Sequence, residues 1–153
     1  MFKIKEIQIH NIGLPLQQTI HMSRVTIEKS NSIIIKAIST NDEVGWGEAA
    51  ASLSMTGESA IGMIRALEYI RSDIINKEIK SFDDISTYVQ TAIYGNYGAK
   101  SAMEVALVDL LAKTQKVSFS DIIGTKLRSE LPIIWRIAGS ENEIDEAKQK
   151  RDE

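Results

Sequence analysis

The sequence predicts an α+β domain in which a three-stranded antiparallel meander is followed by a small bundle of helices. Along most of the first fifty residues, apolar and polar side chains alternate, which is typical of half-buried strands. From residue 56 to residue 113 the apolar residues recur every three or four positions, which is typical of helices that cover a sheet. A last apolar run over 131–138 resembles a strand that is buried on both faces.

The composition favours one folded domain in the cytoplasm. The 153 residues carry 18 Lys and Arg against 21 Asp and Glu, and 43% of them are hydrophobic, which is enough for a packed core. The absence of Cys excludes disulfides, thiolate catalysis and metal sites built on Cys. The net charge of −3 argues against nucleic acid as a partner, and the apolar runs are too short to cross a membrane.

The expected meander has three strands. The first covers 4–12, and a one-residue change of phase after Ile4 predicts a bulge. Residues 13–23 have no clear period and are expected to form an irregular loop. The second strand covers 25–38, and the third begins at Val44 after a polar turn.

Two amphipathic helices are expected next. Thr56 is the expected cap of the first, with Glu58 in its first turn, where a carboxylate stabilises the positive end of the helix dipole. Ser81 and Asp84 have the spacing of a capping box and are expected to start the second.

The third expected helix begins after Asn96 as its cap and is apolar over more than half of its circumference. Beside its main stripe lies a second strip of Val105, Val108 and Ala112. The meander and the other helices supply one obvious layer, so we expect this strip to pack on something else. We therefore divide the chain into a domain of residues 1–130 and a segment, 131–153, that begins a further domain.

The residues with reactive side chains do not assemble a catalytic or metal site by themselves. His10 alternates with apolar residues on a strand, which predicts an exposed structural position. His21 lies in the expected loop beside Ser23 and Arg24, which makes a binding role plausible. Asp109 and Lys113 have the i, i+4 spacing of a helix-stabilising ion pair.

Four stretches together resemble the amino-terminal capping domain of the mandelate racemase and muconate lactonizing branch of the enolase superfamily. They are Val44-Gly-Trp-Gly-Glu-Ala49, Met55-Thr-Gly-Glu-Ser59, the helix of Gly95 to Lys113, and Ile122-Ile-Gly124. Their order and spacing match that family over residues 1–140. The resemblance implies that a (β/α)8 barrel follows the cap, with 131–138 as its first strand.

The resemblance also implies a reaction. In such enzymes Mg2+, held by three carboxylates of the barrel, stabilises the enolate formed when a Lys or His base removes a proton next to a carboxylate. Dipeptide epimerases and muconate cycloisomerases are the activities that the motifs favour. This chain contains no catalytic residue and no metal ligand of that kind, so we expect it to be inactive alone. The implied partners are the barrel, a small carboxylate substrate and further copies of the enzyme.

Two loops of such a cap close over the barrel and select the distal end of the substrate. In this sequence they correspond to 17–24 and 50–55. The candidate substrate-binding residues are His21, Ser23, Arg24, Leu53 and Met55, with Arg136 of the expected barrel strand as a sixth. The alternative hypothesis is a noncatalytic α+β module that acts only by association.

Overall fold

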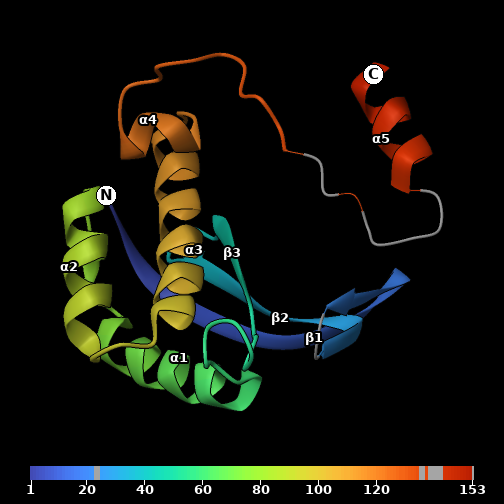
Figure 1. Cartoon of the computed structure of the whole chain (residues 1–153). Helices are drawn as coiled ribbons and strands as arrows, with labels where there is room; N and C mark the ends of the chain where they lie inside the picture. The colour runs from blue at the N-terminus through green and yellow to red at the C-terminus, as the bar shows by residue number, and fades with distance from the viewer. Residues whose placement is uncertain (23–24, 135–136, 138–142, 153) are drawn as a thin grey trace.

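The computed structural model describes residues 1–22, 25–134, 137 and 143–152. In this part of the chain an antiparallel sheet with the strand order β3-β2-β1-β4 carries helices on one face, as Figure 1 shows. The strands are β1 (Phe2–Met22), β2 (Val25–Ser39), β3 (Val44–Ala50) and β4 (Glu78–Ile79), and the helices are α1 (Ala60–Ile74), α2 (Phe82–Ala92), α3 (Tyr97–Gln115), α4 (Phe119–Ile123) and α5 (Glu143–Asp152). The α+β class and the meander are confirmed, and the two-residue strand β4 extends the sheet by pairing with Phe2 and Lys3.

The expected loop over 13–23 was wrong for its described residues. Strand β1 continues to Met22 and pairs with β2 as a long hairpin that extends past the helices (Figure 1). The pairing shifts register after Pro15, where four residues of β1 stand opposite one residue of β2, and resumes at Ile20. An exposed hairpin needs no buried face, so it leaves no period of two in the sequence. The bulge predicted after Ile4 is confirmed by a register shift between Ile4 and Glu6.

The start of α1 differs from the prediction. Ser59, rather than Thr56, caps this helix, and its hydroxyl accepts the N–H of Gly62 at 3.1 Å. Glu58 therefore precedes the helix, and its carboxylate turns to the amino terminus of α3. The capping box predicted for α2 is confirmed, and an equivalent one, which was not predicted, starts α4. Their residues are Ser81 with Asp84 and Ser118 with Asp121.

Strand β3 packs against α3 backbone to backbone. A Cβ atom at Gly47 would overlap the carbonyl oxygen of Ala102 and lie 2.6 Å from the Ala106 nitrogen. A Cβ atom at Gly45 would overlap the Ala106 carbonyl and lie 2.6 Å from atoms of Leu110. Glycine is required at both positions because the two backbones leave no room for a side chain.

Two charged side chains of α3 reinforce the same junction. The carboxylate of Asp109 accepts the backbone N–H of Trp46 at 2.8 Å, and the ammonium of Lys113 at 2.7 Å. Lys113 also donates to the carbonyl oxygen of Val44 at 2.9 Å. The pair predicted from its i, i+4 spacing is thus formed, and it also satisfies backbone groups of the edge strand β3.

The second apolar strip of α3 is covered mostly by the chain itself, which corrects its assignment to an interface with a further domain. Val108 and Ala112 are 2% and 3% exposed, whereas Val105 is 36% exposed. Helix α4 packs against α3, and Ile122 of α4 joins the core. Helix α4 was not predicted, so the burial of this strip was attributed to a further domain.

The apolar run over 131–138 forms no strand in its described residues, 131–134 and 137. Leu131, Ile133 and Ile134 are 75%, 87% and 96% exposed. A strand of a parallel sheet needs neighbours on both sides for its backbone hydrogen bonds. The first barrel strand therefore stays a prediction. Arg136 lies outside the described residues.

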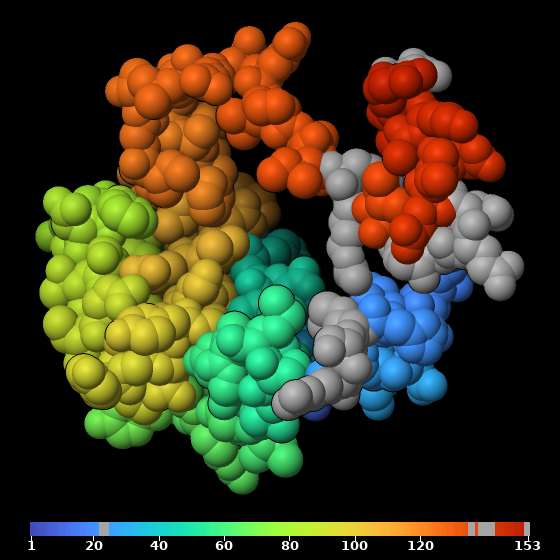
Figure 2. All heavy atoms as spheres, viewed as in Figure 1, coloured from blue at the N-terminus to red at the C-terminus, as the bar shows by residue number. Residues whose placement is uncertain are grey.

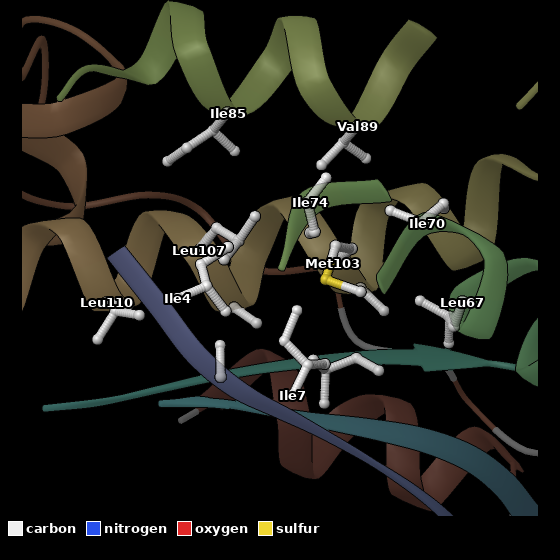
Figure 3. Close-up of a cluster of buried hydrophobic side chains, with 14 of the residues drawn as sticks. Ile4, Ile7, Leu67, Ile70, Ile74, Ile85, Val89, Met103, Leu107 and Leu110 are labelled. Carbon is white, nitrogen blue, oxygen red and sulfur yellow. The ribbon is translucent and has the colours of Figure 1, made fainter. Parts of the chain in front are cut away.

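The core lies between the sheet and α1, α2 and α3, and Figure 3 shows side chains from the sheet and from these three helices pointing toward one another. The labelled residues are Ile4, Ile7, Leu67, Ile70, Ile74, Ile85, Val89, Met103, Leu107 and Leu110. None of the described helices has the length and apolar character needed to cross a membrane.

Candidate binding groove

A groove of about 780 Å³ lies between the distal half of the β1–β2 hairpin and the turn that follows β3. Its lining residues are Leu16, Ile20, Val25, Thr26, Ile27, Glu28, Lys29, Ser30, Asn31, Ala50, Ala51, Ser52, Leu53, Ser54 and Met55. Of the two segments predicted to close over a substrate, all of 50–55 lines the groove, whereas Ile20 is the only described residue of 17–24 in the lining. The fold thus brings together two segments that are about thirty residues apart in the sequence.

The turn on one side of the groove is built around a single carbonyl group. The oxygen of Ser52 accepts the backbone N–H of Thr56 at 2.9 Å and that of Gly57 at 3.2 Å, and also the Thr56 hydroxyl at 2.9 Å. Gly57 has φ of 75°, which favours glycine. Leu53 and Met55 are consequently held at the tip of the turn, 72% and 74% exposed. Figure 2 shows this region, in green-cyan, on the molecular surface.

The opposite wall of the groove belongs to the hairpin. Leu16, Ile20 and Ile27 supply apolar surface, while Glu28 and Lys29 are the charged residues among the described lining residues. The β1 side of this wall was not predicted, because residues 13–23 show no clear period in the sequence. The alternation of Val25 and Ile27 at odd positions was the signal available for the β2 side of it.

The predicted site residues meet different outcomes. Leu53 and Met55 line the groove, as an apolar wall should. His21 is exposed on β1 opposite Thr26, with its Nδ1 atom 3.3 Å from the Thr26 hydroxyl, and lies outside the groove lining. Ser23 and Arg24 lie outside the described residues. A substrate-binding role for these residues stays a prediction.

The groove offers shape and apolar contact rather than reactive groups. Among residues 1–22, 25–134, 137 and 143–152, no group of three or more His, Asp or Glu side chains could hold a metal ion. The lining residues include no His or Cys, and the carboxylate of Glu28 is next to Lys29 in the sequence. Such a site can bind the apolar part of a small molecule and exclude water from it, whereas bond-making chemistry requires groups from elsewhere.

Comparison with known proteins places most of the chain in one family. Residues 4–124 match the family model for the mandelate racemase / muconate lactonizing enzyme, N-terminal domain. A chloromuconate cycloisomerase from Pseudomonas putida is 30% identical over 146 residues, which are 94% of this chain and 39% of that protein. The chain therefore spans about two fifths of the length of this relative.

Solved structures show the same fold. The N-succinyl Arg/Lys racemase from Bacillus cereus superposes with a TM-score of 0.88 at 26% identity, over 98% of this chain and 42% of that one. A dipeptide epimerase from Cytophaga hutchinsonii, solved with Mg and the dipeptide D-Ala-L-Val, has a TM-score of 0.81 at 20% identity over 99% of this chain and 41% of that one. The latter likeness concerns the fold alone.

Proposed function

The chain belongs to the mandelate racemase / muconate lactonizing enzyme N-terminal domain family, and we propose that it is the substrate-capping domain of an enzyme that removes a proton next to a carboxylate. The relatives include a cycloisomerase and a racemase of small carboxylates by name. The reaction we propose is of this epimerase, racemase or cycloisomerase type, on a substrate whose distal part is apolar.

The observation that carries the proposal is the groove between the hairpin and the Ser52–Gly57 turn. Its walls expose Leu53 and Met55 by more than two thirds, although burial of such side chains is what normally stabilises a fold. Apolar residues held open in this way are typical of a surface that binds a ligand or closes on another domain. A cap that supplies such walls excludes water from the reacting centre and discriminates between substrates by their distal groups.

The described residues do not fit a resident metal ion, because they gather no set of ligands for one. We propose that the Mg2+ implied by the family, and the base that removes the proton, belong to the part of the relatives that this chain does not span. The role of this chain's own residues is then to bind and orient the distal part of the substrate. The chain alone is expected to be inactive for this reason.

Deuterium exchange tests the proposal directly. The gene product isolated from its source cell and the 153-residue chain are each incubated in D2O with Mg2+ and either D-Ala-L-Val or N-succinyl-L-arginine. Removal of the proton next to the carboxylate, followed by return of a deuteron, raises the substrate mass by one unit. We expect exchange of D-Ala-L-Val, whose distal side chain is apolar, with the cellular product, weaker or no exchange of N-succinyl-L-arginine, whose distal group is charged, and none of either with the 153-residue chain.

Two outcomes contradict the proposal. Exchange by the verified 153-residue chain would show that the catalytic groups lie within it. Absence of exchange from the cellular product with these and other small carboxylates, including muconolactone, would favour the noncatalytic module instead.

A further inference from the structure

We propose that Glu58 is a positioning residue that ties the Ser52–Gly57 turn to the amino terminus of α3 and so fixes Leu53 and Met55 as one wall of the groove. The inference rests on the proposed function for the use of that wall. The attachment itself is a property of this chain and is tested without a substrate.

The first step is the contact between Glu58 and α3. Both carboxylate oxygens of Glu58 accept the backbone N–H of Gly98, at 3.2 Å for Oε1 and 3.0 Å for Oε2. Gly98 is in the first turn of α3, where N–H groups have no partner within the helix and a negative charge is favourable. The two residues are 40 positions apart, so the contact joins separate parts of the fold.

The amino terminus of α3 has room for this partner because its own cap is absent. Asn96 immediately precedes the helix in the left-handed region, with φ of 55°, and makes no side-chain capping hydrogen bond. Its amide nitrogen donates to the carbonyl oxygen of Tyr94 at 3.0 Å instead. Glu58 therefore provides from across the fold what the predicted cap Asn96 does not.

Gly98 is fitted to the carboxylate. A Cβ atom at this position would lie 2.6 Å from Oε2 of Glu58 and 3.0 Å from the terminal carbon of Met63. A side chain there would force the carboxylate away, so the absence of one permits the approach. This fit indicates that the attachment depends on both partners.

The attachment continues from Glu58 into the turn. The backbone N–H of Glu58 donates to the Thr56 hydroxyl at 3.4 Å, and that hydroxyl donates to the Ser52 carbonyl at 2.9 Å. Ser52 and Glu58 also form an isolated antiparallel bridge. Ser52 and Glu58 are thus paired at the base of the turn, and Glu58 connects this base to α3.

The consequence concerns the exposed tip. A loop with two large apolar side chains in water tends to collapse onto nearby apolar surface, because burial of those groups is favourable. A base fixed by Glu58 holds Leu53 and Met55 in the groove lining without a partner on their outer side. A wall that is ordered before the ligand arrives does not have to be ordered during binding, which favours affinity and selectivity.

The test is native-state hydrogen exchange of the 153-residue chain and three variants: Glu58→Ala, Glu58→Gln and the control Glu104→Ala, at a half-buried position of α3. The amides followed are those of Thr56 and Gly57, which donate to Ser52, with Leu67 and Ile70 of the core as references. The methyl resonance of Met55 reports on the tip.

We expect Glu58→Ala to accelerate exchange at Thr56 and Gly57 by about tenfold or more relative to the core amides, since the turn then opens locally. Glu58→Gln keeps one acceptor oxygen and should restore part of the protection, whereas Glu104→Ala should change nothing. The Met55 resonance should shift toward its random-coil position in the order control, Gln, Ala. Equal acceleration of turn and core amides, or none at the turn, would overturn the proposal.

A double-mutant cycle checks the same attachment from its other end. Gly98→Ala displaces the carboxylate without removing it, so it should accelerate the turn amides as Glu58→Ala does, and the double variant should add little. Additive effects would show that the two residues act independently and would contradict the proposal. These measurements stand apart from catalysis: failure of the deuterium-exchange assay with a protected turn removes the proposed function but leaves the attachment intact.

Discussion

The β3–α3 junction and the turn beside the groove both contain glycine and large apolar residues, but the junction buries most of the large apolar side chains of α3, whereas the turn exposes its own. At the junction, Gly45 and Gly47 allow two backbones to meet, and α3 buries the large apolar side chains of Met103, Leu107, Val108, Leu110 and Leu111. At the groove, Leu53 and Met55 are kept in contact with solvent by a turn closed with hydrogen bonds. Close packing sets the structure of the junction. In the groove, the hydrogen bonds of the turn keep apolar side chains exposed to solvent.

The difference teaches where stability and function are located in this molecule. Substitutions at the junction change the volume of a close-packed interior and are expected to act on folding. Substitutions at the tip of the turn change an exposed surface and are expected to act on binding. The predictions below test this division from the largest expected effect on stability to the smallest.

The largest effect is expected for Gly47→Ala. The new methyl group would overlap the carbonyl oxygen of Ala102, and neither backbone can move without separating β3 from α3. We expect a loss of about 3 kcal/mol or more in the free energy of unfolding, measured with urea. Gly124→Ala is the control, because nothing lies within 4 Å of a Cβ atom there. Similar values for the two variants would contradict the junction's role.

A smaller loss is expected for Asp109→Ala. This change removes the acceptor of the Trp46 N–H and the partner of Lys113, so we expect about 1–3 kcal/mol of destabilisation. Asp73→Ala is matched to it, because Asp73 also forms an i, i+4 pair with a lysine, Lys77, at 3.0 Å, but this pair lies at the exposed end of α1 and, among the described residues, holds no backbone group of a strand. Its loss should be below about 0.5 kcal/mol. The comparison fails if the two variants unfold at the same urea concentration.

The capping box of α2 makes a small pH-dependent contribution. Hydrogen bonds from the Lys80 and Ser81 backbone lower the pKa of Asp84 below its usual 3.8. A carboxyl with a lowered pKa in the folded state stabilises the fold above its unfolded pKa, and this contribution is lost as the pH falls through the folded value.

Asp84→Asn should therefore lose stability at neutral pH and approach the parent chain as the pH falls below 3.8. Thermal melts of both proteins at several pH values between neutral and acid measure this. A constant difference between the melting temperatures over the whole series would refute the assignment to the Asp84 carboxylate.

The smallest effect on stability is expected at the groove. Leu53→Ser and Met55→Ser remove apolar groups that are already exposed, so the unfolding free energy should stay within about 0.5 kcal/mol of the parent. The buried Met63→Ser, also a methionine, serves as the contrast and should cost several times more, on the order of 2–5 kcal/mol. A large loss for Met55→Ser would mean that the wall belongs to the folding core.

The sequence predicted those parts of the fold that depend on local pattern. The capping box of Ser81 and Asp84 and the bulge after Ile4 were visible in it. Helix α4 was missed, although Ser118 and Asp121 repeat the capping-box spacing, because the helix is too short to show a period.

The parts that depend on distant contacts were less accessible. The role of Glu58 could not be read from its position near Ser59, since the carboxylate acts on a helix 40 residues away. The β1 side of the hairpin wall was missed because residues 13–23 show no alternating pattern. Of the groove's lining residues, only Leu53 and Met55 were named in advance as site residues. His21 was chosen because an imidazole can bind a substrate. Its position in the sequence does not show whether it lies in the groove, and it lies outside the lining.

The intact mass of the gene product in its source cell tests the central claim, that this chain is the cap of a larger enzyme. The product would be captured with an antibody raised against residues 1–124 and measured by mass spectrometry without digestion. The account predicts a mass greater than 17.0 kDa by the roughly 250 residues of a barrel. A product of 17.0 kDa alone would contradict it and would leave the groove to be explained by a binding partner.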